Sequence, residues 1–147
     1  MKRFQFRLER FLELRKWKER EWELKLARVL GQCLLLERRI AEIGEEISAS
    51  RGEVFRDGNR IDMIAMSRRE LYIQRLTLER KRTQVQLIER RKELEEVRAK
   101  YLEVSKERKV LDKLRERKET EYYEHARDEE YKATDDMNTA AATRVHW

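Results

Sequence analysis

The sequence contains no proline, only four glycines and a single cysteine among 147 residues. Because proline and glycine interrupt helices, their scarcity excludes a loop-rich fold. One cysteine cannot form an internal disulfide bond, and a lone thiol is typical of a reducing compartment, so we expect the cytoplasm. The longest apolar runs, at residues 33–36 and 63–66, are far shorter than the roughly 20 residues of a membrane span. The first ten residues also lack the apolar stretch of a secretory signal, so neither a membrane span nor export by that route is expected.

Charged residues make up 45% of the chain and hydrophobic residues only 39%. The mean hydropathy of -0.98 leaves too little apolar surface for a thick core, whereas a pair of long helices needs only a narrow apolar seam. The net charge is +6. This charge permits acidic partners such as nucleic acid, anionic lipid or an acidic protein channel, and does not choose among them.

The first half of the chain carries a heptad repeat, the spacing that keeps one helix face against a partner helix. We expect a helix over residues 4–50. Its seam residues alternate in steps of three and four: Leu26, Val29, Cys33, Leu36, Ile40, Ile43 and Ile47. Upstream, this frame would place Arg15 and Glu19 in the seam, so the row Phe4, Leu8 and Phe11 predicts a shifted register near the N-terminus.

A reversal is predicted at residues 51–62, where Asp57, Gly58 and Asn59 supply the residue types that tight turns prefer. A second helix is expected at 63–136, followed by a flexible tail at 137–147. The predicted fold is therefore all-α, a single domain over residues 1–147 that forms a long antiparallel two-helix coiled-coil hairpin with unequal arms.

The second helix carries two apolar rows. One row should face the first helix and contains Ile73, Leu76, Leu87, Leu94, Val97, Tyr101, Val104 and Leu111. The other row repeats every seven residues about half a helical turn away and contains Ile64, Leu71, Leu78 and Val85. Two interpretations remain open: either the register slips along this helix, or a second face meets a partner.

The two ends of the chain differ in charge. Residues 1–20 hold eight Lys or Arg against three Glu, and residues 121–136 hold seven Asp or Glu against two basic residues. In a hairpin, both segments lie at the open end, away from the turn.

No pattern in the sequence indicates catalytic, cofactor or metal chemistry. The glycines are scattered rather than clustered into a phosphate-binding loop. Cys33, His125 and His146 lack the spacing of a metal site, and a helix pair offers no cleft for a catalytic acid. We therefore predict a protein without enzymatic activity, cofactor or metal. The basic clusters at residues 80–82 and 90–92 suggest nucleic acid as an alternative partner, but interleaved acidic residues favour a solvated coiled-coil face.

Two segments resemble the FliJ family of flagellar type III export proteins. The opening KRFQFRLERFLELRKWKEREWELKLARVLG has that family's Phe-x-Phe-x-Leu-Glu start, followed by Leu-x-Leu-Arg-Lys. The later segment VSKERKVLDKLRERKETEYY is similar to the family's C-terminal stretch, and an acidic segment follows it, as is usual in the family. With the hairpin topology, the resemblance covers nearly the whole chain.

The resemblance implies a soluble, nonenzymatic protein of the flagellar export apparatus, peripherally associated with the inner membrane and similar in fold to the central stalk subunit of rotary ATPases. The open end of the hairpin would enter the pore of the hexameric export ATPase and promote its assembly and activity. Other surfaces would contact the cytoplasmic region of the export-gate membrane protein and escort flagellar export chaperones, with no small-molecule substrate. Alternatives are the stalk protein of a virulence-type secretion system and a basic nucleic-acid-binding coiled coil.

The resemblance also implies two sets of contact residues. The ATPase-ring set lies in the two matching segments and contains Phe4, Phe6, Leu8, Phe11, Leu12, Lys109, Val110, Leu111, Lys113, Leu114 and Arg117. The export-gate set contains Tyr72 and Leu76, which lie one helical turn apart. Leu76 can alternatively belong to the seam between the two helices.

Overall fold

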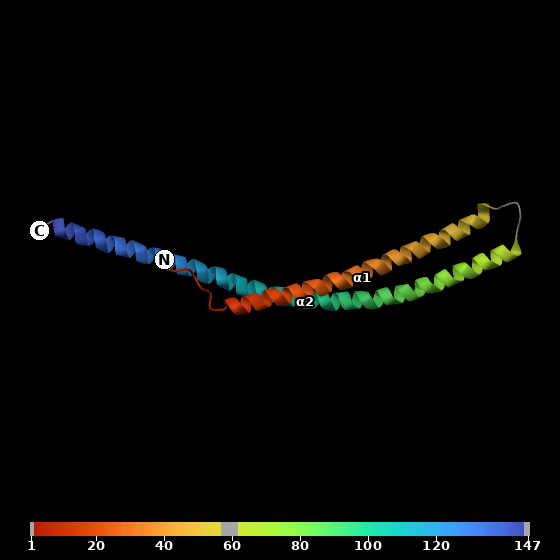
Figure 1. Cartoon of the computed structure of the whole chain (residues 1–147), viewed down its shortest axis with the longest axis horizontal. Helices are drawn as coiled ribbons and strands as arrows, with labels where there is room; N and C mark the ends of the chain where they lie inside the picture. Colours follow the sequence, from red (N-terminus) through yellow and green to blue (C-terminus); the bar gives the residue numbers. More distant parts are fainter. Residues whose placement is uncertain (1, 57–61, 146–147) are drawn as a thin grey trace. The chain divides into compact units, whose positions relative to one another are not determined.

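The computed structural model describes the backbone of residues 2–56 and 62–145, and all of their side chains except those of residues 54–56. Two α-helices account for most of these residues, α1 at Glu9–Arg56 and α2 at Met63–Val145 (Figure 1). The described ranges contain no strand. The prediction of an all-α fold built from two long helices is therefore confirmed.

The boundaries of α1 differ from the prediction at both ends. Residues 2–8 are not helical, and the chain enters α1 through a turn in which Glu9 N donates to Phe6 O (3.2 Å) and Leu12 N to Leu8 O (3.0 Å). At the other end α1 continues to Arg56, into the segment where the turn was expected. The predicted Asp57-Gly58-Asn59 turn lies outside the described residues.

The N-terminus of α2 is capped by Asp62. Its Oδ1 accepts hydrogen bonds from the backbone N–H groups of Ile64 (3.0 Å) and Ala65 (3.4 Å), which satisfies donors that have no partner in the first helical turn. At its other end α2 extends to Val145, through residues that were predicted to form a flexible tail. Three consecutive alanines at 140–142 favour this extension, because alanine has the highest helix propensity.

The chain divides into two compact units, and both helices contribute to each. We call Met1–Arg20 with Leu102–Trp147 the terminal unit, and Glu21–Tyr101 the central unit. In the central unit, Glu53 pairs with Arg69 and Glu37 pairs with Arg91, so the two helix segments run antiparallel. The terminal unit is likewise an antiparallel pair, because residue 9 contacts residue 115 and residue 15 contacts residue 107.

The core of the central unit consists of the predicted seam residues. Ile43 and Ile47 of α1 pack with Ile73 and Leu76 of α2. A second cluster contains Val29, Cys33 and Leu87, with Leu36, Ile40, Leu94 and Val97 partly buried against it. The heptad frame read from the sequence is therefore confirmed for this unit.

The second apolar row of α2 faces solvent. Its four side chains, Ile64, Leu71, Leu78 and Val85, have exposed fractions between 51% and 67%. Because Ile73 and Leu76 are buried in the same stretch of helix, a register slip that turns the second row inward does not occur. A partner for this face is the interpretation that remains.

The predicted register shift near the N-terminus is wrong. Leu12 is fully buried, whereas Phe11, which the shifted frame would place inside, is 60% exposed. The inward positions Leu8, Leu12, Arg15 and Glu19 are spaced four, three and four residues apart, and all are at least half-buried. The frame tolerates the two charges because Glu107 and Arg108 of α2 pair with them.

Candidate functional site

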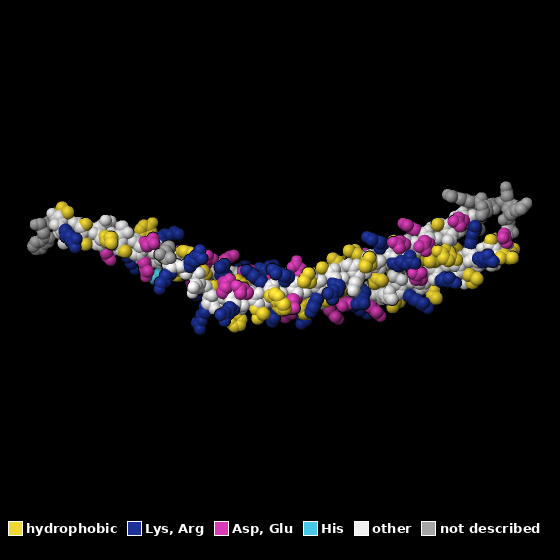
Figure 2. Space-filling model, in the orientation of Figure 1, with side chains coloured by type: hydrophobic (Ala, Val, Ile, Leu, Met, Phe, Trp, Pro, Cys, Tyr) yellow, Lys and Arg dark blue, Asp and Glu magenta, His cyan; other side chains and the backbone are white. Residues whose placement is uncertain are grey.

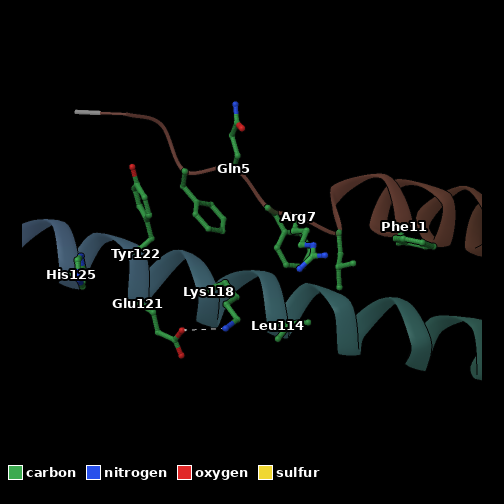
Figure 3. A pocket seen from close by; sticks show the side chains of 11 residues that line it. Gln5, Arg7, Phe11, Leu114, Lys118, Glu121, Tyr122 and His125 are labelled. Carbon is green, nitrogen blue, oxygen red and sulfur yellow. Dashed lines mark ion pairs between the residues drawn. The ribbon is translucent and has the colours of Figure 1, made fainter.

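Residues 2–8, which precede α1 and which we call the N-terminal segment, lie along α2 and contact Tyr122. The hydroxyl of Tyr122 donates a hydrogen bond to the backbone oxygen of Lys2 at 2.6 Å. The rings of Phe4 and Tyr122 are 5.7 Å apart between centroids, a separation typical of favourable aromatic pairs. Figure 3 shows Tyr122 extending from α2 toward this segment, while Gln5 points away from α2.

A groove of about 810 Å³ lies between the N-terminal segment and α2 (Figure 3). Most of its lining is apolar and comes from Phe4, Phe6, Leu8, Phe11, Leu114 and Tyr122. On its α2 side, Lys118 and Glu121 form an ion pair at 3.6 Å. A concave, mainly apolar surface with a charged margin is suited to receiving side chains of a partner protein.

Ion pairs fix the helices beside this groove. Glu9 pairs with Arg115 at 3.0 Å. Arg108 is enclosed by two carboxylates: Glu19 on α1, and Asp112 on its own helix at 2.6 Å. The guanidinium of Arg108 donates hydrogen bonds to Glu19 and Asp112, which stabilise its charged form and raise the pKa of Arg108 above its usual range.

A basic ridge runs along the outer surface of α2 in the terminal unit. Lys109, Lys113 and Arg117 follow one another at four-residue intervals, and each is exposed. Val110 lies beside them and is 66% exposed. Leu111 and Leu114 are half-buried. The ridge therefore presents positive charge next to an exposed apolar side chain.

The predicted ATPase-ring set thus falls entirely within the terminal unit. Phe11, Val110 and the three basic residues of the ridge are exposed, whereas Leu12 is fully buried in the seam. Phe4, Phe6, Leu8 and Leu114 line the groove. The structure brings the two segments together from opposite ends of the sequence, as an antiparallel helix pair requires.

The two predicted gate residues have different environments in the central unit. Tyr72 is 44% exposed, and its hydroxyl lies 3.4 Å from Oε2 of Glu46. Leu76 is only 4% exposed and packs with Ile43, Ile47 and Ile73. Of the two, only Tyr72 offers substantial surface to another molecule.

Of the residues considered for reactive chemistry, Cys33 is structural and His125 is solvated, whereas His146 lies outside the described residues. Cys33 is buried in the seam, and His125 lies 3.6 Å from Glu129 on an exposed face. Among the described residues, no group of three or more His, Cys, Asp or Glu side chains is arranged to hold a metal ion. Neither described helix combines the length and apolar content needed to cross a bilayer.

The two basic clusters are not equivalent. In the cluster at 90–92, Arg90 pairs with Glu93 at 2.7 Å and Arg91 with Glu37 at 2.9 Å. These pairs reduce the positive potential available to nucleic-acid phosphates. The cluster at 80–82 borders the exposed row of α2.

The decisive comparison is with known protein families. The model of the family described as Flagellar FliJ protein matches residues 4–145, nearly the whole chain. The chain belongs to the FliJ family. FliJ proteins are components of the flagellar protein export apparatus, which is a type III secretion system, and the helix pair described above is the coiled coil expected of a FliJ protein. No curated protein and no solved structure matches the chain.

Sequence reasoning missed two features of this FliJ-family chain. One is the charged seam, for which the sequence does hold a signal: residues 15 and 19 of α1 and residues 107 and 108 of α2 carry opposite charges at positions that an antiparallel pairing brings together. The other is the nonhelical N-terminal segment. The segment contacts α2 through residues 2 and 122, a pairing that no local pattern in the sequence reveals.

Proposed function

We propose that this chain is the nonenzymatic stalk of a flagellar export ATPase. In this proposal the terminal unit enters the pore of the hexameric ATPase and promotes assembly of the ring and its activity. The observation that carries the proposal is the family match over residues 4–145. The groove and the basic ridge support it, because together they give this unit apolar and positively charged surface for a protein partner.

The proposed mechanism is a bias on subunit conformations. In this proposal the chain supplies no catalytic group to the ATPase, so it changes the rate of ATP hydrolysis only by binding one conformation of the ring more tightly than another. Lys109, Lys113 and Arg117 would supply this preference by pairing with acidic residues of the pore, and Phe11 and Val110 by apolar contact.

We further propose that Tyr72 contacts the cytoplasmic region of the export-gate membrane protein, and that the chain escorts export chaperones. The protein would then be cytoplasmic and peripherally associated with the inner membrane at the export apparatus. Leu76 would act only by holding α2 in place, because its side chain is buried.

The test of the stalk role is the ATPase rate and oligomeric state of the cognate export ATPase, measured with and without the full chain. We expect faster hydrolysis and formation of a ring. The triple variant K109E/K113E/R117E should lose the stimulation, since it reverses three exposed charges without touching the seam. The matched control R68E/R75E/R82E changes the same number of exposed arginine or lysine charges in the central unit and should keep it.

Two outcomes would contradict the proposal. One is the absence of any effect of the folded wild-type chain on the ATPase. The other is equal stimulation by the two triple variants, which would remove the ridge from the contact. For the gate, Tyr72→Ala should weaken binding to the purified cytoplasmic region of the gate protein, and Tyr131→Ala, which truncates a tyrosine that is 66% exposed, should not.

A further inference from the structure

The exposed apolar row of α2 supplies one large apolar residue per heptad along a single helix face. Ile64, Leu71, Leu78 and Val85 recur every seven residues and lie on the side of α2 turned away from α1. A seven-residue repeat drifts only about 20° per heptad, so the four side chains stay on one face of α2 over three heptads, where another helix could pack along them. We call this row, together with the arginines described next, the outer stripe.

Three arginines border the row on one side. Arg68, Arg75 and Arg82 each follow an apolar residue of the row by four positions, one helical turn, and all three are exposed. Among the described residues, none of the three forms an ion pair, whereas Arg39 in the central unit is held by Glu79 at 2.8 Å. Over α2 near its start, Figure 2 shows hydrophobic side chains lying between Lys and Arg side chains.

We propose that the outer stripe binds an acidic amphipathic α-helix of another protein, which packs on α2 as a third helix. The apolar side chains of that helix would enter the spaces between the four members of the row. Its carboxylates would pair with the three arginines, which are placed as the flanking charges of a coiled coil are placed.

Self-association through the same surface is disfavoured by charge. In an antiparallel dimer across the outer stripe, the arginine row of one copy lies against the same row of the other. Repulsion between like charges opposes this pairing, and an acidic helix meets no such opposition.

A membrane surface is disfavoured by the width of the apolar face. A helix that lies in a lipid interface presents a broad apolar sector. Here the positions on the other side of the row are mostly polar, with Ser67, Gln74 and Lys81 preceding Ile88. A single row of large apolar residues suits the narrow contact with another helix.

This inference does not depend on the stalk role, because the outer stripe lies in the central unit and excludes Leu76 of the seam. The sequence left two interpretations of this apolar row, a register slip that buries it or a second face that meets a partner. Because the row is exposed in the structure, it is available to a partner.

The test uses two labelled synthetic helical peptides of four heptads, identical except for their flanking residues, which are Glu in one and Lys in the other. Each heptad of the peptides carries leucine at one of its two seam positions and alanine at the other, which keeps the peptides from pairing with themselves. Binding to the full chain is measured by fluorescence anisotropy. We expect the Glu peptide to bind, more weakly at higher salt, and the Lys peptide to bind at least about tenfold more weakly, as three reversed charge contacts imply.

The variants provide the decisive comparison. R68E/R75E/R82E should reverse the binding preference, so that this variant binds the Lys peptide and no longer binds the Glu peptide. L71Q/L78Q should lose both peptides, and the matched variant L24Q/L35Q, whose leucines on α1 are 67% and 64% exposed, should bind as the wild type does.

Several results would overturn the inference. These are no binding of the Glu peptide by a folded chain, binding that R68E/R75E/R82E does not reduce, or binding that L24Q/L35Q reduces as much as L71Q/L78Q. Self-association in sedimentation equilibrium that L71Q/L78Q abolishes would assign the stripe to a second copy. Absence of peptide binding together with binding to phosphatidylglycerol vesicles would assign it to lipid.

Discussion

Glu19 and Arg108 form an ion pair in the helix interface of the terminal unit, where 15% and 24% of their side chains are exposed. In a coiled-coil seam these positions usually hold apolar residues. Removing one partner of such a pair leaves the other charge poorly solvated, whereas replacing both with apolar residues removes the cost of desolvation.

This relationship gives a prediction for stability. Glu19→Leu and Arg108→Leu should each lower the free energy of unfolding by about 1–2 kcal/mol, less than for a fully buried pair because both side chains retain some solvent. The double variant should be no less stable than either single variant. Urea unfolding followed by circular dichroism measures the stability of the wild type, the two single variants and the double variant, which together form a double-mutant cycle. Simple additivity of the two losses would show that the residues do not interact. As a control, Glu93→Ala in the exposed Arg90–Glu93 pair should change stability by less than about 0.5 kcal/mol.

Gly31 offers a route to a more stable protein. It lies inside α1, and a Cβ atom added there would meet no heavy atom within 4 Å. Gly31→Ala should therefore raise the free energy of unfolding by roughly 0.5–1 kcal/mol, the difference in helix propensity between the two residues. Gly44→Ala, at a site with the same open space, should have a similar and additive effect. Thermal unfolding curves provide the measurement, and a decrease in stability at either site would reveal a close contact at that position.

Cys33 reports on opening of the central unit. It is the only cysteine of the chain and is 3% exposed in the cluster with Val29 and Leu87. A thiol reagent such as dithionitrobenzoate reacts with it only when this part of the helix pair opens. We expect labelling to be at least about a hundredfold slower in buffer than in urea, and Leu87→Ala to accelerate it by loosening the same cluster. Fast labelling of the folded wild type would show that the seam is open at this point.

Tyr122 contacts the N-terminal segment through both its hydroxyl and its ring, so we expect it to hold the segment against α2. Tyr122→Phe removes the hydrogen bond to Lys2 O but keeps the ring beside Phe4, so trypsin should cleave after Arg7 several-fold faster. Tyr122→Ala should accelerate cleavage further, because it removes the ring contact as well. Tyr123→Phe is the control, and it should leave the cleavage rate unchanged. Equal cleavage of the wild type and Tyr122→Ala would mean that the tyrosine does not hold the segment.

The sequence predicts the central unit well because its folding is governed by a local rule. Leu26 to Ile47 follow a strict heptad, and a long helix without proline has few ways to bury such a row. The same rule fails at residues 15 and 19, where charge was taken as evidence against burial. The charges are tolerated there because partners about 90 residues away in the sequence supply the opposite sign.

The candidate surfaces were less predictable from the sequence. The sequence shows that Leu71 and Leu76 are on different faces of one helix, but only packing decides which of the two is buried. The groove is harder still, because it depends on Phe4 and Leu114 meeting across most of the chain length. The pairing of residues so distant in sequence arises only when the two helices fold together, and no periodic pattern in the sequence indicates it.

The part of α2 after Ala126 consists of residues that are all exposed as far as Val145. A separate peptide of this length would be only marginally helical in water, because starting a helix is costly. Here the preceding turns of α2 act as the starting template, and each further residue adds to a helix that already exists. Amide hydrogen exchange should accordingly become faster from Ala126 toward Val145, with fraying progressing inward from the C-terminal turn of α2. A molecule that binds this segment meets a largely preformed helix and loses less chain entropy than it would in folding a disordered tail.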